Sequence, residues 1–469
     1  MADTTTADLT CDVVVIGAGT AGLAAERVAR SEGARTLLID DRFAGTTCAT
    51  VGCMPSKLLI TAGMAAQSIR RAEVFGIDAT PRIDGKRVMQ RVRCERDRFV
   101  AATRQGFDDL PEGVAIKACA RFTGPNTLVL DDGRIVSART VVIATGSKPI
   151  IPEPFRKFGD VIDTNDTIFE LDELPRSLAV IGAGALGLEL AQAFASLGVE
   201  VVVFEHGDHV GGVHDPVVEA ELKRILRRCM TLHLGVDASP SAEDGGVVIN
   251  WDGGSQRFDR VLVSTGREPK LDGLGLDQTG LALNDRGVPI YDKSTMQCGD
   301  APIFIAGDAD ADRSVLHEAA NEGAIAGRNA ACFPNVEAVE RDLPFTITFT
   351  DPPVAILGEP AGEDSVIGCA PYDDQGRAKV MAQAEGMVRI YASRPDGRLT
   401  GAAMIGPGMD HIAHLLALAI MRGETATGLL ALAFYHPTLE EGLKPGLREI
   451  CHEVHAPLSQ RDQGIPPGA

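Results

Sequence analysis

Residues 13–30 read VVVIGAGTAGLAAERVAR. An apolar, β-branched run breaks at Gly17, Gly19 and Gly22, which have G-x-G-x-x-G spacing, and a helix-forming stretch follows. This pattern predicts a strand, a tight turn and a helix. In such a unit the first glycine permits the turn, the second lets the backbone approach a pyrophosphate, and the third lets the helix pack on the strand. The N-terminus of the helix then faces the phosphates.

An acidic residue completes this unit. Asp40 follows the next apolar strand, residues 36–39. It lies about 20 residues beyond the last glycine, where a carboxylate can accept hydrogen bonds from ribose hydroxyls. The combination predicts a dinucleotide site. A single G-x-G-x-x-G can also be a glycine-rich turn without chemical meaning, so the first unit alone leaves both alternatives open.

The same constellation recurs further along the chain, in LAVIGAGALGLEL at residues 178–190. Its three glycines are Gly182, Gly184 and Gly187. The second acid, Glu205, ends the strand VVVFE. The number of residues from Asp40 to Glu205 equals the number from Gly17 to Gly182. A duplicated register argues against two accidental turns, so we expect two Rossmann-like nucleotide-binding units.

Two shorter segments support the duplication. VVIATGSKP at residues 141–149 and VLVSTGREP at residues 261–269 are buried-strand patterns that end in T-G-x-x-P. Each is expected to close one nucleotide-binding unit. A further buried strand, PIFIAGD, ends at Asp308. The carboxyl ends of strands in open α/β sheets present ligand contacts, and Asp308 is expected to make one.

The length of 469 residues predicts two to four domains, because single cores stop growing at about 250 to 300 residues. We expect an α/β fold with two Rossmann-like dinucleotide-binding domains and a C-terminal α+β domain. The predicted domains are 1–150 and 151–270 for nucleotides, 271–343 as a return segment completing the first domain, and 344–469. The last contains no nucleotide fingerprint, so subunit contact is its leading expected role.

The charge and the apolar stretches bound the expected partners and location. A formal net charge of -20 repels nucleic-acid phosphates and anionic lipid, so neither nucleic acid nor a membrane is an expected partner. The apolar residues 412–421 fall short of the about 20 that a spanning helix needs. The first residues show no secretory signal pattern. A cytoplasmic location is therefore expected.

Cys48 and Cys53 form the close pair among ten cysteines, most of which stand singly as expected of reduced thiols. The spacing suits a redox centre or half of a metal site. No second pair or nearby histidine completes a zinc tetrad, so no metal is expected. The pair lies in GTTCATVGCMPSK, residues 45–57, soon after the first nucleotide unit. Thiols beside a dinucleotide predict a flavin, because nicotinamide does not readily exchange electrons with a disulfide unaided.

These motifs resemble the flavin-dependent pyridine nucleotide:disulfide oxidoreductases, the family of dihydrolipoamide dehydrogenase, glutathione reductase and mercuric reductase. The resemblance runs from the first fingerprint to the C-terminal HPTLEE, and its most specific part is the segment C-x4-C-x-P-S-K. It is closest to dihydrolipoamide dehydrogenase, while the E-G-L-K after the C-terminal motif is similar to mercuric reductases. The resemblance implies an FAD site at the first fingerprint, an NAD site at the second, and a two-fold dimer formed by the last domain.

The resemblance also implies which residues bind these cofactors. The expected set is Gly17, Gly19, Gly22, Asp40, Gly45, Thr46, Thr145, Gly146 and Asp308 for FAD, with Gly182, Gly184, Gly187, Glu205 and Gly266 on the NAD side. Cys53 would lie against the flavin, and Cys48 would exchange with the substrate. A helix start after Cys48 is expected to favour its reactive thiolate form.

Four further residues match the catalytic machinery of the family. Lys57 and Glu189 match a pair near the flavin, where a cation would stabilise negative charge on the reduced ring. His436 in YHPTLEE matches the acid/base and Glu441 the carboxylate that orients it, since imidazole titrates near neutrality and a carboxylate makes it a stronger base. The histidine would act on Cys48 of the partner subunit, which implies an obligate homodimer with shared sites.

The nucleotide preference and the substrate follow less directly. Glu205 suits a ribose 2′-hydroxyl and repels a 2′-phosphate, and the residues after it lack the arginines of NADP-using relatives, so NAD is expected. MPSKLLI is unlike glutathione reductases, and the lone Cys451 argues against mercury. We expect a dihydrolipoamide:NAD oxidoreductase that serves the lipoyl domains of a multienzyme complex. The alternative is NADH-dependent reduction of another small disulfide, a quinone or a metal ion, and Phe434 and Tyr435 before the base keep it open.

Overall fold

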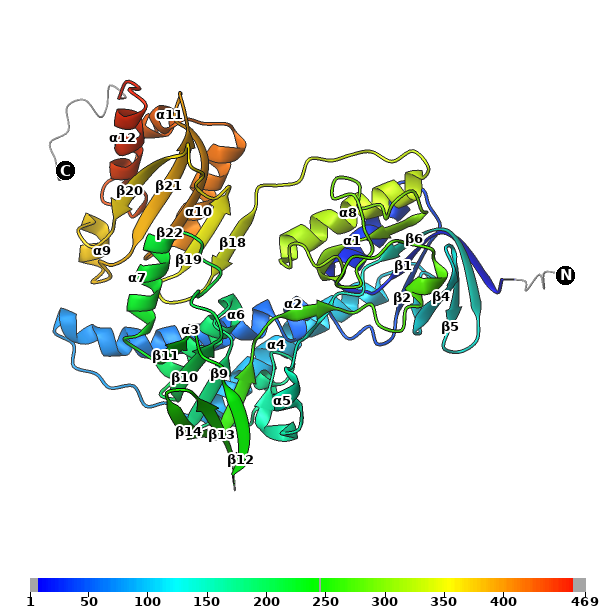
Figure 1. The fold of residues 1–469 in the computed structure, drawn as a ribbon, viewed down its shortest axis with the longest axis horizontal. Helices are drawn as coiled ribbons and strands as arrows, with labels where there is room; N and C mark the ends of the chain where they lie inside the picture. Colours follow the sequence, from blue (N-terminus) through cyan, green and yellow to red (C-terminus); the bar gives the residue numbers. More distant parts are fainter. Residues whose placement is uncertain (1–6, 244–245, 459–469) are drawn as a thin grey trace. The chain divides into compact units, whose positions relative to one another are not determined.

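The computed structural model describes residues 7–243 and 246–458 and contains two compact units (Figure 1). The first comprises Met1–Pro55, Arg91–Ile150 and Gly266–Asp342. The second comprises Ser56–Gln90, Ile151–Thr265 and Leu343–Ala469. The predicted domain boundaries near residues 150, 270 and 343 stay predictions, and the outer limits at residues 1 and 469 lie outside the described residues.

The first unit is built on a seven-stranded sheet in the order β3-β2-β1-β6-β5-β4, with β17 also paired to β6. Its strands are β1 Leu9–Ile16, β2 Thr36–Asp40, β3 Ala115–Lys117, β4 Ala120–Gly124, β5 Thr127–Leu130, β6 Ile135–Ile143 and β17 Ile303–Ile305. β1, β2, β3, β6 and β17 are parallel, as expected where helices connect buried strands. β17 lies within residues 271–343 and pairs parallel with the C-terminal end of β6.

Two helices lie side by side over one face of this sheet, α1 Thr20–Ser31 and α8 Leu316–Cys332 (Figure 1). Glycines let their backbones approach. A Cβ on Gly323 would lie 2.2 Å from the Ala21 carbonyl oxygen, and one on Gly327 would lie 2.2 Å from that of Ala25. The two T-G-x-x-P segments meet at the edge of this unit, where β7 Ser147–Pro149 pairs antiparallel with β16 Arg267–Pro269.

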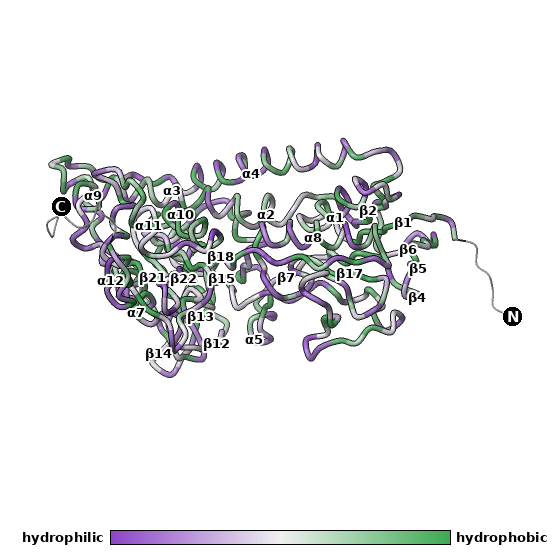
Figure 2. Tube along the Cα trace, turned by 90° about the horizontal axis from the view of Figure 1, so that it is seen from above, coloured by the Kyte–Doolittle hydropathy of each residue, from purple (hydrophilic) through white to green (hydrophobic). Residues whose placement is uncertain are grey.

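Three helices connect β2 to β3. They are α2 Thr47–Thr50, α3 Cys53–Arg71 and α4 Gly85–Asp108, with the 3₁₀ turn η1 Ala72–Phe75 after α3. Hydrophilic and hydrophobic residues are interleaved along α4 (Figure 2). By length and composition alone, the segment Thr47–Phe75 has the properties of one membrane span. A single such segment is weak evidence, because helices in protein cores pass the same test. Two of its cations, Lys57 and Arg71, pair with carboxylates of the protein.

A five-stranded parallel sheet, in the order β11-β10-β9-β15-β8, holds the second fingerprint in the second unit. Its strands are β8 Ile162–Asp163, β9 Ser177–Ile181, β10 Glu200–Glu205, β11 Thr231–Leu234 and β15 Arg260–Val263. Its helices are α5 Glu153–Arg156, α6 Ala185–Ser196 and α7 Pro216–Leu226. A three-stranded antiparallel sheet packs on this one, with Val247, Ile249 and Phe258 against the apolar face of β9 and β10. Its strands are β12 Ser239–Glu243, β13 Gly246–Trp251 and β14 Gly254–Phe258.

The C-terminal part of the second unit is an antiparallel sheet in the order β18-β19-β22-β21-β20, covered by helices. Its strands are β18 Phe345–Thr348, β19 Val354–Gly358, β20 Val366–Pro371, β21 Met387–Ser393 and β22 Arg398–Ile405. The helices are α9 Gly376–Val380, α10 Met409–Met421, α11 Ala426–Leu430, η6 Glu440–Leu443 and α12 Lys444–Glu453. The predicted fold class, with two nucleotide-binding units and a C-terminal α+β domain, is therefore confirmed.

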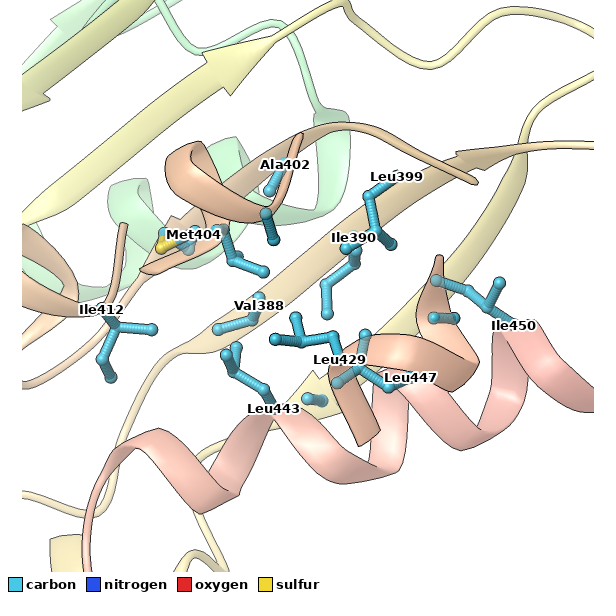
Figure 3. Packing of buried hydrophobic residues seen from close by; sticks show 14 of the residues in the cluster. Val388, Ile390, Leu399, Ala402, Met404, Ile412, Leu429, Leu443, Leu447 and Ile450 are labelled. Atoms are coloured by element: carbon cyan, nitrogen blue, oxygen red, sulfur yellow. The ribbon is translucent and has the colours of Figure 1, made fainter. Parts of the chain in front are cut away.

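The core of this C-terminal part is fully buried (Figure 3). Val388, Ile390 and Met404 of the sheet face Leu443 and Leu447 of η6 and α12. Burial of each Leu or Ile contributes about 2 kcal/mol. α12 also contacts β20 at backbone distance, since a Cβ on Gly368 would lie 2.0 Å from the Gly446 carbonyl oxygen. The segment that carries His436 precedes η6 and α12, so its C-terminal end is attached to this buried core.

Candidate active site

The first fingerprint turns the chain from β1 into α1. Gly17 has a φ of 103°, and a Cβ there would lie 2.4 Å from the carbonyl oxygen of Ala144. A Cβ on Gly22 would lie 1.8 Å from the Gly17 carbonyl oxygen. Gly19, in contrast, faces open space. The backbone itself thus requires Gly17 and Gly22, while Gly19 leaves room at the N-terminus of α1 for a ligand.

The second fingerprint repeats this geometry between β9 and α6. Gly182 has a φ of 105°, and its Cβ would lie 2.5 Å from the Ser264 carbonyl oxygen. A Cβ on Gly187 would lie 2.3 Å from the Gly182 carbonyl oxygen, and Gly184 faces open space. In both sets the first and third glycines avoid a clash with a carbonyl oxygen, and the middle glycine leaves open space, as expected of a duplicated dinucleotide-binding turn.

The two acids also occupy equivalent positions. Asp40 accepts a hydrogen bond of 2.9 Å from the backbone N–H of Ala18, inside the first fingerprint. Glu205 accepts one of 2.6 Å from the backbone N–H of Ala183, inside the second. Each carboxylate thereby ties the end of the second strand to the glycine turn, next to the open position that a ribose would approach.

A cavity of the first unit brings several predicted residues together. Its wall includes Gly19, Cys48, Cys53, Gly146 and Asp308, which come from widely separated segments. The cysteine pair therefore lies on the same cavity as the first fingerprint. Two further predicted residues, Gly45 and Thr46, are the first residues of the segment 45–57 that carries the cysteines.

Two helices surround the cysteines. A helix was expected to start after Cys48, and the long helix α3 begins at Cys53; the short helix α2, which contains Cys48, was not expected. The Thr46 hydroxyl caps α2 by accepting from the Ala49 N–H at 3.3 Å. The chain then turns at Gly52, where a Cβ would lie 2.8 Å from the Thr47 carbonyl oxygen. Cys48 is half-buried and Cys53 is exposed.

The polar atoms of this cavity fit a flavin dinucleotide. The hydroxyl oxygen of Thr145 is buried and has no hydrogen-bond partner among the described residues. Its neighbours Ala144 and Gly146 line the cavity. A buried polar atom without a partner is costly, and a ligand would relieve that cost. With the open Gly19 and the Asp308 carboxylate, the cavity offers hydrogen-bonding groups of the kind that FAD needs.

Several residues that support Asp308 were not identified from the sequence. Ser147 donates to the Asp308 carboxylate at 2.7 Å, and Arg267 donates in turn to the Ser147 hydroxyl at 2.8 Å. Glu322 of α8 accepts from the Gly307 N–H at 2.8 Å and pairs with Arg341. Burial raises the pKa of Glu322, with Asp310 adding in the same direction. Ser147 and Arg267 stand at one position of the repeated T-G-x-x-P segments, which was the available signal.

In the second unit, Lys57 and Glu189 form the predicted ion pair. Lys57 Nζ lies 2.7 Å from Glu189 Oε2, and Glu189 Oε1 accepts from the Phe349 N–H at 2.8 Å. The ammonium also lies 4.5 Å from the centre of the Phe349 ring. Glu189 is buried on α6 and Lys57 is half-buried on α3. A charge-assisted hydrogen bond and a cation–π contact thus hold the lysine in one position.

His436 and Glu441 are also in contact. Nδ1 of His436 lies 3.0 Å and 3.2 Å from the two carboxylate oxygens of Glu441. The Thr438 N–H donates to the same carboxylate at 3.1 Å. The imidazole is 71% exposed, while Glu441 is largely covered. A carboxylate on Nδ1 selects the tautomer that leaves Nε2 able to accept a proton.

No group of three or more metal-ligating side chains is found in the part of the chain that the structure describes.

The chain is similar to known proteins over most of its length. Residues 11–323 match the pyridine nucleotide-disulphide oxidoreductase family, and residues 345–446 match the dimerisation domain of the same family. Dihydrolipoyl dehydrogenase of Haloferax volcanii is 33% identical over 457 residues, covering 92% of this chain and 94% of that protein. The enzyme of the same name from Bacillus subtilis is 32% identical over 472 residues, covering 95% and 100%.

Solved structures share the fold. LpdA from Mycobacterium tuberculosis has a TM-score of 0.80 at 25% identity, covering 94% of this chain and 99% of that one. The HOCl-induced flavoprotein disulfide reductase RclA from Escherichia coli has a TM-score of 0.82 at 22% identity, covering 93% and 99%. The match to a dimerisation domain supports a homodimer. The predicted resemblance is confirmed: the chain belongs to the pyridine nucleotide-disulphide oxidoreductases, enzymes that depend on FAD and use NAD(P)H.

Proposed function

We propose that this enzyme oxidises dihydrolipoamide with NAD, in free form or on the lipoyl domains of a multienzyme complex. The observation that carries the proposal is the cavity of the first unit, whose wall holds Cys48 and Cys53 together with Gly19 and Asp308. The relatives named dihydrolipoyl dehydrogenase, at 33% and 32% identity over nearly the whole chain, support this substrate.

The chain's own residues can perform the thiol chemistry in balanced steps. His436 accepts a proton from one substrate thiol, and the resulting thiolate attacks the sulfur of Cys48 in the Cys48–Cys53 disulfide. Cys53 leaves as a thiolate. The sulfur of the second substrate thiol then displaces Cys48, and its proton passes to the Cys48 sulfur as that sulfur leaves. The substrate becomes a disulfide, and the enzyme retains a Cys48 thiol, a Cys53 thiolate and the first proton on His436. Bound FAD would pass these two electrons from the thiol pair to the nicotinamide.

We assign the base to the partner subunit, as the family resemblance implies, so that two chains complete each site. Support comes from the exposure of His436, whose imidazole faces solvent within its own chain. Glu441 holds Nδ1 and would stabilise the imidazolium once the proton is taken. A shared site makes the homodimer obligatory for dithiol turnover.

We assign Lys57 to the flavin side of the site. Its ammonium, held by Glu189, would stabilise the negative charge that reduction brings to the ring. A cytoplasmic location stays a prediction that accords with the single, scattered cysteines.

NAD is the proposed nucleotide. Glu205 ends β10 beside the second fingerprint, and its carboxylate also accepts from the Gly207 N–H at 3.1 Å. A negative charge fixed at this place repels a 2′-phosphate and can accept from a 2′-hydroxyl. Nδ1 of His206, the residue after Glu205, lies 2.6 Å from a carboxylate oxygen of Asp237, so a second carboxylate lies near the end of β10.

A second candidate is the NADH-dependent reduction of another small disulfide, a quinone or a metal ion. The observation that favours it is the aromatic pair before the base. Tyr435 is 81% exposed next to His436, and Lys444 Nζ lies 5.5 Å from the centre of the Phe434 ring. These groups would shape the approach to the base and could select a substrate other than a lipoyl chain.

Steady-state assays separate the two candidates. The proposed function predicts rapid NAD reduction with dihydrolipoamide, and a loss on the order of 100-fold or more in His436→Gln. A disulfide, quinone and metal-ion panel with NADH runs in parallel. Absence of turnover with dihydrolipoamide, beside rapid reduction of a panel member, would replace the first candidate with the second.

A further inference from the structure

The loop that carries His436 connects α11 to η6, and within it the Thr438 hydroxyl donates to the Tyr435 carbonyl oxygen at 2.7 Å. Tyr435, His436 and Pro437 are all exposed. An exposed loop of this kind samples several conformations unless its backbone is tied down. The position of the imidazole therefore depends on what holds the backbone of this loop.

Two largely buried side chains from a distant segment hold that backbone. The Tyr372 hydroxyl donates to the Leu439 carbonyl oxygen at 2.8 Å. Gln375 Nε2 donates to the Thr438 carbonyl oxygen at 2.7 Å. Tyr372 follows β20 and is 0% exposed, and Gln375 precedes α9. Both bonds bind the residues that directly follow His436–Pro437.

The orientation of each donor is set by its surroundings. Gln375 Oε1 accepts from the Ala378 N–H at 2.7 Å, where it caps α9, so its amide nitrogen must face Thr438. Burial raises the pKa of Tyr372, and Glu440 and Glu441 add in the same direction. Its hydroxyl therefore keeps the proton that it donates.

The neighbouring glycine is fitted to this arrangement. A Cβ on Gly442 would lie 2.6 Å from the Tyr372 hydroxyl and ring, so only glycine lets the tyrosine reach the loop. Both backbone polar groups of Thr438 are then bound: Gln375 donates to its carbonyl oxygen, and the Glu441 carboxylate accepts from its N–H. Because Glu441 also binds His436 Nδ1, the chain of bonds runs from Gln375 to the imidazole.

We propose that Tyr372 and Gln375 are positioning residues for the acid/base His436. They bind the carbonyls of Leu439 and Thr438 and so fix the loop on which Glu441 orients the imidazole. This inference rests on the proposed function, in which His436 takes the proton of the dithiol. Misplacement of a catalytic group by about 1 Å costs on the order of 100-fold in rate, so two buried hydrogen bonds at its base affect turnover.

Tyr372→Phe tests the first bond, since it removes one hydroxyl and no charge. We expect kcat with dihydrolipoamide to fall about tenfold, with KM within about twofold, because the base and not substrate binding is disturbed. The acidic limb of the pH–rate profile should move, and amide hydrogen exchange over residues 434–441 should become faster. NADH-dependent reduction of ferricyanide, which bypasses the base, should stay unchanged.

The matched control is Tyr391→Phe, which removes another buried tyrosine hydroxyl of the C-terminal part, one on β21 that donates to Asp215 at 2.8 Å. It should leave kcat, the pH profile and exchange over 434–441 unchanged. A decrease in kcat equal to that of Tyr372→Phe would mean that general destabilisation explains both, and the inference would be wrong.

Gln375→Glu tests the second bond. A carboxylate still caps α9 by accepting from the Ala378 N–H but cannot donate to Thr438. Exchange over 434–441 should again become faster, and unchanged exchange and kcat in both variants would overturn the inference. His436→Gln in the same assay separates the two levels: if it leaves dithiol turnover intact, the proposed function fails, whereas loss of turnover in His436→Gln alone refutes only the positioning role.

Discussion

The two nucleotide-binding units share one backbone design and differ in the atoms that they leave for a ligand. In both, the first and third glycines are required by close carbonyl oxygens, the middle glycine faces open space, and an acid binds the turn. In the second unit the Ser264 hydroxyl lies 3.1 Å and 3.0 Å from the Ile181 and Gly182 carbonyl oxygens, which completes the turn internally.

The first unit instead has Ala144 at the corresponding contact and leaves the neighbouring Thr145 hydroxyl buried without a partner within the described residues. It also has Cys48 and Cys53 on its cavity wall. A common scaffold thus determines that a dinucleotide binds, and the residues that follow it determine which chemistry is performed there.

Substitution of the cysteine pair should produce the largest difference between the units. Cys48→Ser should lower dithiol turnover by on the order of 10³-fold or more, since the Cys48–Cys53 disulfide that the substrate reduces can no longer form. FAD content and NADH binding, which depend on the fingerprints, should remain. Steady-state rates and the flavin spectrum measure both. Cys119→Ser, at an exposed cysteine of the same unit, is the control, and an equal loss there would contradict the assignment.

Alanine at the third glycine should separate the two cofactors. Gly22→Ala places a Cβ 1.8 Å from a carbonyl oxygen and should remove most bound FAD, because the turn must distort by several tenths of an ångström or more. Gly187→Ala, with a clash at 2.3 Å, should keep FAD and raise the KM for NADH by about tenfold or more. The absorbance ratio of flavin to protein and NADH kinetics measure these effects.

The control for both glycine variants is Gly106→Ala. Gly106 lies in α4, and a Cβ there meets nothing within 4 Å. Alanine should raise the free energy of unfolding by about 0.5 to 1 kcal/mol and change neither cofactor. Loss of FAD from Gly187→Ala but not from Gly22→Ala would reverse the assignment of the two units.

Glu205→Gln should sharpen the comparison at the acids. Removal of the charge should lower the preference for NADH over NADPH by about tenfold in kcat/KM, equivalent to about 1.4 kcal/mol. Glu200→Gln, at the other end of β10, is the control and should leave the preference unchanged. An unchanged preference in Glu205→Gln would mean that another group rejects the 2′-phosphate.

Thr145→Val should give the smallest effect, with opposite signs in the two states. Without FAD, removal of a buried hydroxyl that lacks a partner should raise the free energy of unfolding by about 1 kcal/mol. With FAD, the lost hydrogen bond should weaken flavin affinity several-fold. Thermal unfolding of the flavin-free protein and FAD titration check the two signs. Thr265→Val, in the second T-G-x-x-P segment, should leave FAD affinity unchanged.

Local patterns were sufficient to predict the nucleotide-binding units. A β-branched strand, spaced glycines and a following helix lie within about 20 residues, so propensity and packing agree over a short range. The return of β17 to the first sheet also followed from its buried-strand pattern and its Gly-Asp end. A helix begins after Cys48, at Cys53, but the short helix α2 that contains Cys48 was not predicted, because the Thr46 cap and the turn at Gly52 are decided by individual contacts.

The supporting residues of the site could not be predicted in this way. Tyr372 and Gln375 donate to carbonyl oxygens more than 60 residues away in the sequence. Glu322 of α8 accepts from the Gly307 N–H, which precedes that helix. Such contacts depend on how buried elements pack, and no short-range pattern encodes them. The Lys57–Glu189 pair was predicted from the resemblance alone, because its partners come from two helices far apart in the sequence.

Anaerobic titration of the purified enzyme with NADH, followed by the flavin absorption spectrum, tests the communication between nucleotide, flavin and the cysteine pair most directly. A long-wavelength thiolate-to-flavin band should appear after two electrons per subunit, and the same titration of Cys48→Ser should reach full bleaching after those two electrons. Direct bleaching of the unmodified enzyme without the band would show that Cys48 and Cys53 do not exchange electrons with the flavin, and the proposed disulfide chemistry would have to be abandoned.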